Sequence, residues 1–363
     1  MELLQNLVSA PQTATEKEVD DNIITLVDRL AHSTLVSDRR SAVLAIKSYS
    51  RNYREIVIAK GLKQLFITLH TDNSDLDIVK AILEILIILF IRGEGNKDLT
   101  RDWINTQSRV QNGKYPSPSI LIQNIKPDQF SLWIADELTQ SLSNLELLIE
   151  VLDFDDIHIK IYSLQLLQAL VSTRNKRTQE LILKSPTAIS LLCQVLDDDY
   201  EPIRNEAILL LMGIVKNNFN IQKLVVFENT FDKLYNIIEQ EGGIQGTIIV
   251  QDCLSLISNL LNFNSSNQKY FIETNCLPKL VHLIDQCLNI TSFTWNVQRL
   301  DNLTTTLETC RLFVIKDTQD IEDSQNAILN SGILLSCLKL VFSLNIPNEI
   351  RVTSLLTVSD IIR

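Results

Sequence analysis

Hydrophobic residues recur along this chain in helix-length segments, and the spacing of the segments is itself repeated. One segment, IRNEAILLLMGIV (203–215), begins with charged and amide side chains and then becomes almost wholly apolar. Four other segments align with it on a small residue, and apolar residues follow one, four and seven positions later. This spacing is one face of an α-helix. The five small residues are Ala42, Ala81, Ser163, Ala207 and Cys253.

A second, shorter amphipathic segment follows each of these helices. Its copies cover 62–69, 188–195, 231–238, 277–284 and, more weakly, 333–340. The small residues lie 39, 82, 44 and 46 positions apart, and we interpret the 82 as two units with one degenerate copy between them. Repeats of about 40–47 residues with two or three helices are typical of armadillo and HEAT proteins. We therefore expect an all-α, armadillo/HEAT-like right-handed superhelical solenoid over 1–363, because each repeat must stack on its neighbours to bury its apolar face.

Two segments interrupt the repeat. The longer one, 93–128, contains three prolines and exceeds an inter-helix turn, and loops of this length are functional or mobile. We expect it to lie outside the stacked core and to be cut first by proteases between 113 and 126. The shorter one, NITSFTWNVQ (289–298), pushes the next repeat to about 303–314.

Composition and charge narrow the function. Hydrophobic residues make up 45% of the chain and glycine and proline number only nine and eight, which favours helices joined by short loops. The net charge of −11 gives no basic face for nucleic acid. The densest basic run, STRNKRTQ (172–179), is interpreted as a solvated loop between helices. The most apolar run, 81–91, is too short to span a membrane.

Candidate chemistry is sparse. The six cysteines have no CxxC pair and several lie in apolar helices, which indicates reduced core thiols in a cytosolic protein. The four histidines have no metal-ligand spacing. The acidic runs LDFDDIH (152–158) and LDDDYEP (196–202) precede inner helices, where aspartates cap N-termini. The glycines of EQEGGIQG (239–246) are expected to form a linker. No catalytic residue, cofactor or metal site is predicted.

A solenoid without a reactive site is most often a binding surface. Armadillo proteins that hold extended peptides carry an asparagine ladder on their inner helices, and Asn259 in LISNLL resembles one rung. Because the matching positions are Ser48, Ile87, Ala169 and Gly213, a peptide clamp is the weaker hypothesis. Trp103 and Tyr115 lie in the long insertion, where exposed aromatic residues would suit a partner surface. Trp133, in the apolar FSLWIADEL, is expected to be core.

Several long segments resemble a known family. RNEAILLLMGIV, IQKLVVFENTFDKLYNIIEQEGG, VQDCLSLISNLLNFNSSNQKYFIETNCLPKL and NIPNEIRVTSLLTVSDIIR are similar to the globular head of the general vesicular transport factor family. SDRRSAVLAIKSYSRNYRE and FIRGEGNKDLTRDWI resemble its fungal branch, the intracellular transport tether of yeasts. The match runs essentially from 26 to 363.

The resemblance implies a non-enzymatic tether that captures ER-derived vesicles at the Golgi and binds a Rab-family GTPase and SNARE proteins. It implies a cytoplasmic protein. Because the net charge is −11 and anionic membranes attract clustered Lys and Arg, we expect the protein to reach membranes only through protein partners. Family members continue with more head repeats, a dimerising coiled coil and an acidic tail, so 1–363 is expected to be the N-terminal part of the head. Two alternatives remain: an armadillo adaptor for nuclear transport or scaffolding, and an enzyme on a helical scaffold.

Overall fold

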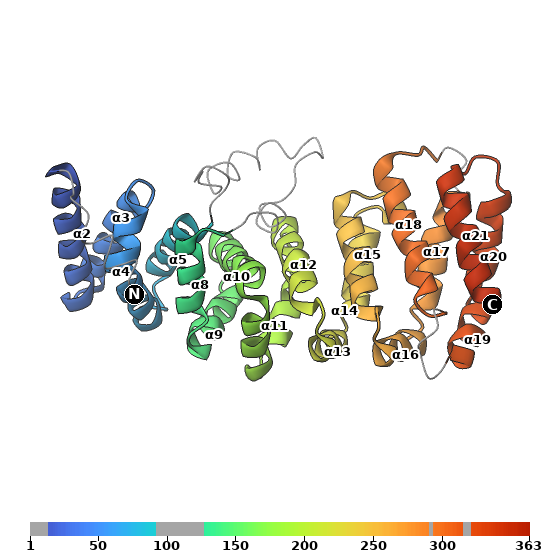
Figure 1. The fold of residues 1–363 in the computed structure, drawn as a ribbon, viewed down its shortest axis with the longest axis horizontal. Helices are drawn as coiled ribbons and strands as arrows, with labels where there is room; N and C mark the ends of the chain where they lie inside the picture. Colours follow the sequence, from blue (N-terminus) through green and yellow to red (C-terminus); the bar gives the residue numbers. More distant parts are fainter. Residues whose placement is uncertain (1–13, 92–126, 290–292, 315–320) are drawn as a thin grey trace. The chain divides into compact units, whose positions relative to one another are not determined.

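Every regular element that the computed structural model describes is a helix (Figure 1). The structure describes residues 14–91, 127–289, 293–314 and 321–363. Within these ranges no residue belongs to a β-strand, which confirms the all-α helical-repeat fold expected from the sequence. The chain forms two compact units, Met1–Leu191 and Leu192–Arg363.

The first unit is a stack of helices that pack in sequence order. Its helices are α2 (Ala14–His32), α3 (Val36–Ser50), α4 (Arg54–Thr71), α5 (Leu76–Phe90), α8 (Gln129–Leu138), α9 (Leu142–Glu150), the 3₁₀ turn η3 (Val151–Asp153) and α10 (Ile157–Lys184), and α11 (Ala188–Gln194) begins in it. α3 packs on α5, α5 packs on α10, and α2 packs across α3 and α4.

The second unit repeats a three-helix pattern of one short helix, one medium helix and one long inner helix. Its elements are η4 (Val195–Asp197), α12 (Glu201–Val215), α13 (Phe219–Phe227), α14 (Thr230–Gln240), η5 (Gly243–Gln245), α15 (Ile248–Leu261), α16 (Ser265–Glu273), α17 (Leu277–Asn289), α18 (Val297–Arg311), α19 (Ile321–Ser331), α20 (Ile333–Phe342) and α21 (Asn348–Ile362). The long helices stack on one another in the order α12, α15, α18 and α21. We call these four helices, with α3, α5 and α10, the inner helices.

The five aligned small residues all lie on inner helices and are at most 4% exposed, as the repeat pattern predicted. The aliphatic residues one position later are fully buried: Val43, Ile82, Leu164, Ile208 and Leu254. A small side chain lets the neighbouring helix approach closely, and the apolar residue beside it fills the space between them. Ser163 fits this position because its hydroxyl donates to the Leu148 carbonyl.

Two further inner helices, α18 and α21, continue the stack with a more polar pattern. The shorter insertion was expected to delay the next repeat to about 303, but α18 begins at Val297. Its buried face carries Asn302 at the position of the small residue, and Thr306 and Thr309 at positions that are apolar in the other repeats. The Thr306 hydroxyl donates to the Asn302 carbonyl at 2.9 Å, so this polar face is buried with its hydrogen bonds made.

Two local predictions were only partly right. The basic run 172–179 was expected to be a solvated loop between helices; it does contain the junction of two helical segments of α10, but this junction is a kink at Arg174 (φ −135°, ψ 47°) rather than a loop. Arg174 forms a two-point ion pair with Asp136, at 2.6 and 2.9 Å, which positions the kink. Asp156 caps α10 as expected. At α12, however, the N-cap is Tyr200, with no side-chain cap.

Three glutamines, two of them buried and Gln325 half-buried, bind the ends of inner helices in the second unit. Gln222 donates from Nε2 to the Asn259 carbonyl at 3.0 Å, Gln268 donates to the Leu312 carbonyl at 3.2 Å, and Gln325 donates to the Ile361 carbonyl at 3.4 Å. Each acceptor lies at the C-terminal end of an inner helix, where carbonyls lack partners within the helix. We call these three residues the glutamine clamps, because each fixes a short outer helix to an inner helix.

Candidate interaction surface

The predicted contact Asn259 lies on α15 with its side chain exposed, six positions after the buried Cys253. At the equivalent position, the other inner helices carry Ser48, Ile87, Ala169, Gly213 and, on α18, Glu308. Ile87 and Ala169 are buried, so this position does not face solvent in every repeat. The inner helices that the structure describes therefore do not present a row of asparagines like that of peptide-binding armadillo proteins.

An amide network connects the N-terminal ends of α15 and α18. Gln298 on α18 donates to Gln251 Oε1 at 2.8 Å and to Asn302 Oδ1 at 3.1 Å. Asn302, which is fully buried, donates in turn to the carbonyls of Ile244 and Gly246 in the turn before α15. A connected network of this kind fixes the two neighbouring helices against one another.

Asp252 lies on α15 next to the buried Cys253. Its side chain is largely buried, and burial raises the pKa of its carboxyl group to about 7. A carboxyl group with this pKa is partly protonated at neutral pH and can donate as well as accept a hydrogen bond. Perturbed carboxyl groups occur at functional sites and in structural positions alike. The protonation of Asp252 itself therefore changes near neutral pH.

The described part of the chain assembles no catalytic or metal-binding constellation. Groups of three or more His, Cys, Asp or Glu side chains that could hold a metal are not found among the described residues. All six cysteines are buried and unpaired with one another, as predicted for core thiols. Burial raises the pKa of the Cys193 thiol to about 12, which strongly disfavours a nucleophilic thiolate.

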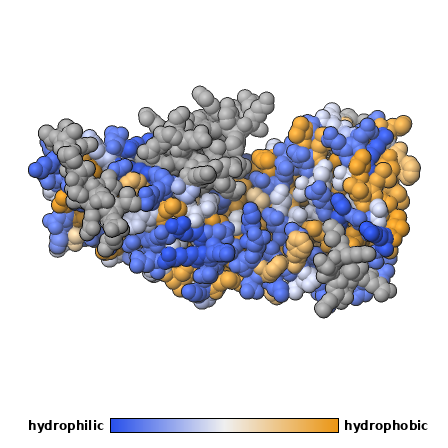
Figure 2. Space-filling view, viewed as in Figure 1, coloured by the Kyte–Doolittle hydropathy of each residue, from blue (hydrophilic) through white to orange (hydrophobic). Residues whose placement is uncertain are grey.

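Hydrophobic side chains gather over α20 and α21 in the second unit (Figure 2). The strongly exposed hydrophobic residues of α20, α21 and the turn between them are Leu335, Phe342, Leu344, Val352, Leu355, Leu356 and Ile362. Next to this turn, the Trp295 indole N–H donates to the Asn345 carbonyl at 2.9 Å, and its ring packs against Phe293. Exposed apolar residues that gather in one place are typical of contact surfaces. The sequence showed Phe293 and Trp295 only as part of an insertion.

The other predicted aromatic contacts have different outcomes. Trp103 and Tyr115 fall outside the described residues, and their role stays a prediction. Trp133, expected in the core, is only half-buried on α8.

The long insertion ends at Asp128, which caps α8 and forms an ion pair with the buried Arg54.

Among the described residues, no single helix combines the length and apolar character that crossing a membrane requires. One bent pair, Asp323–Ser331 with Ile333–Phe342, satisfies the criteria of length and composition together.

Stacked three-helix units with exposed contact surfaces define the chain as an armadillo-like helical-repeat protein. No family model matches it. Over its whole length it is 50% identical to the intracellular protein transport protein USO1 of Saccharomyces cerevisiae and 30% identical to the general vesicular transport factor p115 of Homo sapiens. The chain belongs to the general vesicular transport factor family and lies in its globular head.

Solved structures agree with this assignment. A crystal structure of Uso1 superposes with a TM-score of 0.87 at 50% identity, covering 98% of this chain and 52% of the crystallised chain. A computationally designed armadillo repeat protein, at 15% identity, superposes with a TM-score of 0.52 over 79% of this chain and 99% of the design, which is a likeness of fold alone.

The chain spans only part of its relatives: 20% of the length of the yeast protein and 36% of the human one. Both relatives are named as transport factors rather than enzymes, which confirms the expectation of a non-enzymatic protein.

Proposed function

We propose that this chain is part of a vesicle-tethering head that acts in ER-to-Golgi transport. The observation that carries the proposal is the 50% identity, over the entire chain, to a yeast protein named for intracellular protein transport. The repeat fold supports it, because stacked helical repeats present extended surfaces suited to binding other proteins.

The proposed partners are a Rab-family GTPase and SNARE proteins, with self-association in the full-length protein. The backbone at the exposed Asn259 is held by Gln222, which donates to the Asn259 carbonyl at 3.0 Å, so it would lose little entropy when a partner binds. Trp103 and Tyr115 remain the proposed contacts within the long insertion. We propose a cytoplasmic protein that associates peripherally with the Golgi and with ER-derived vesicles.

Recruitment to membranes would occur through protein partners. The chain has a net charge of −11, and an anionic membrane surface attracts clusters of Lys and Arg rather than acidic proteins. We expect the protein not to float with anionic liposomes alone and to float when an activated Rab is anchored on them. Flotation on bare anionic liposomes would contradict the electrostatic argument.

The central experiment is a pulldown with the ER–Golgi Rab loaded with GTP or with GDP. Preferential capture by the GTP form supports the proposed tethering function. If the exposed surface at Asn259 on α15 contributes to binding, the variant Asn259→Ala should weaken this capture. Asn220→Ala, an exposed amide on the outer helix α13, is the matched control. Equal capture by both nucleotide states, even after the protein is artificially dimerised to restore avidity, would count against Rab recognition by this chain. Capture of import-signal peptides would instead favour the adaptor alternative.

A further inference from the structure

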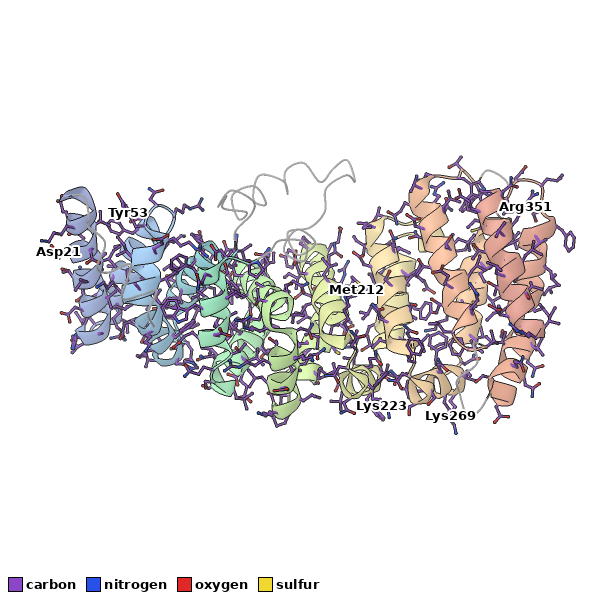
Figure 3. All side chains as sticks on the ribbon, viewed as in Figure 1. Asp21, Tyr53, Met212, Lys223, Lys269 and Arg351 are labelled. Carbon is purple, nitrogen blue, oxygen red and sulfur yellow. The ribbon has the colours of Figure 1, made fainter. Side chains whose placement is uncertain are left out.

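The outer helices α13 and α16 carry aromatic and cationic side chains on one exposed surface. Equivalent positions in these two consecutive repeats lie 46 residues apart, so Lys223 and Lys269 occupy the same place in each. Both are exposed and lie on the outer side of their helices (Figure 3). We call the group the outer aromatic surface, defined by Phe219, Lys223, Phe227, Phe263, Lys269 and Tyr270.

The register between the two helices brings these residues together. α13 packs on α16. At one end, Asn264, which follows Phe263, donates to Gln222 Oε1 at 3.0 Å, so the backbone of the turn that carries Phe263 lies next to α13. At the other end, the rings of Phe227 and Tyr270 lie 6.4 Å apart. Phe219, Lys223 and Phe227 are spaced four residues apart along α13, so they form one continuous stripe.

Phe263 has a backbone conformation that its side chain does not favour. Its φ is +54°, in the left-handed region, and its ring is 76% exposed. The equivalent residue in the preceding repeat is Asn217, with φ +56°, and asparagine tolerates this region far better than a bulky residue. Because Phe263 is exposed, no burial of its side chain offsets the cost of this backbone conformation. Asparagine would form this turn at lower cost. A phenylalanine that is both strained and exposed here is therefore better explained by binding than by folding.

The outer aromatic surface rests on a rigid support. Phe271 lies on the buried side of α16. Its ring packs edge to face on Phe231, with 4.9 Å between the ring centroids, and against Phe313, with 5.4 Å between them. Aromatic packing of this kind fixes α16, so the exposed residues above it are already ordered before any partner arrives.

We propose that the outer aromatic surface is a docking site for an amphipathic helix of a partner protein, whose apolar face is flanked by acidic side chains. Phe219, Phe227 and Phe263 supply the apolar contact, as aromatic residues do at the centres of protein interfaces. Lys223 and Lys269 supply the complementary charge, and neither forms an ion pair within the described part of the chain. The cationic pair occupies matching repeat positions and favours acidic side chains on the partner, whereas the exposed Glu273, four residues after Lys269, limits the positive charge to one end of α16. The inference goes beyond Rab and SNARE recognition and does not depend on it.

The probe is a labelled helical peptide of about 20 residues, with leucine at helix-face spacing and glutamate beside it; fluorescence anisotropy measures its binding to the full chain. We expect saturable binding that weakens as salt rises, and weaker binding of a control peptide with lysine in place of glutamate. The charge reversals Lys223→Glu and Lys269→Glu together should weaken binding about tenfold, whereas the arginine versions should retain it.

The decisive variant is Phe263→Asn, which restores the asparagine of the preceding repeat. We expect it to lower affinity for the acidic peptide about tenfold while its melting temperature stays the same or rises. This outcome separates docking from folding. Equal binding of the acidic and basic peptides, or unchanged affinity in Phe263→Asn, would overturn the proposal.

Two other binding partners, a membrane or a second copy of the chain, would give different experimental results. Phe263-dependent sedimentation with vesicles of phosphatidylcholine and phosphatidylserine would overturn the helix in favour of a membrane. Phe263-dependent dimerisation in sedimentation velocity would overturn it in favour of a second copy of the chain.

Discussion

Replacing the glutamine clamp Gln268 with methionine tests how repeats of the second unit are fixed to one another. Gln268 is 4% exposed on α16 and donates to the Leu261 carbonyl at 3.0 Å and the Leu312 carbonyl at 3.2 Å. Methionine has nearly the same length and fills the same space, but it has no donor. The substitution therefore removes two buried hydrogen bonds and creates little or no cavity.

The loss of stability depends on which hydrogen bonds each carbonyl keeps after the substitution. The Leu261 carbonyl also accepts from the Asn264 amide at 3.3 Å, so its loss is limited to about 1 kcal/mol, a typical net hydrogen bond. Leaving the Leu312 carbonyl without the Gln268 donor costs about 1–2 kcal/mol more. We expect a total loss of about 2–3 kcal/mol in the free energy of unfolding. For a unit of this size, the corresponding fall in melting temperature is roughly 4–12 °C.

Thermal and urea denaturation, followed by circular dichroism, measure the effect. Lys269→Met, at the exposed neighbouring position, is the matched control and should change stability by less than about 0.5 kcal/mol. If Gln268→Met were no more destabilising than Lys269→Met, the amide would not hold the repeats together and the reasoning would be refuted.

Three further substitutions test other parts of the structure. Ala207→Leu should overpack the contact in which Ala207 of α12 is buried and cost about 1–3 kcal/mol in denaturation, with Ala207→Ser costing less; equal costs would show that this contact has room. Asp252 keeps a proton in the folded chain between about pH 4 and pH 7 that the unfolded chain releases, so stability should fall as pH rises through this window. Asp252→Asn should flatten that fall and raise the melting temperature at about pH 8; an unchanged pH profile would contradict the raised pKa. Arg54→Met removes a buried cation that donates to the Leu89 carbonyl at 2.7 Å, and should destabilise the first unit by about 2–4 kcal/mol, unlike the exposed control Lys63→Met.

The inner helices with aliphatic faces could be predicted from the sequence, because apolar residues at helix spacing form a stripe that the fold must bury against a neighbouring helix. Ala42, Ala81, Ala207 and Cys253 follow this rule directly. α18 was placed six residues too late because its buried face contains Asn302, Thr306 and Thr309. A hydrophobicity pattern cannot show that Asn302 donates to two carbonyls 56 and 58 positions earlier in the chain, and this bonding is what makes its burial possible.

The contact surfaces were harder to predict for a related reason. The glutamine clamps are polar residues in amphipathic segments, and only their position in the folded repeat distinguishes them from solvated glutamines. Phe263 appears in the sequence as one more hydrophobic residue at a helix end. Its left-handed backbone and its exposure become visible only when the turn is compared with that of Asn217. Exposure and dihedral angle depend on three-dimensional context rather than on local composition.

The glutamine clamps also bear on how the chain can change in length. Gln222 and Gln268 are 46 positions apart, whereas Gln268 and Gln325 are 57 apart, with the shorter insertion between them. Gln325 nevertheless donates to the C-terminal end of α21, as its predecessors do to α15 and α18. Extra residues are thus accommodated between the clamps without altering which helix ends are joined. A connection can therefore be longer in one repeat than in another, and display different residues, while the same helix ends remain joined beneath it.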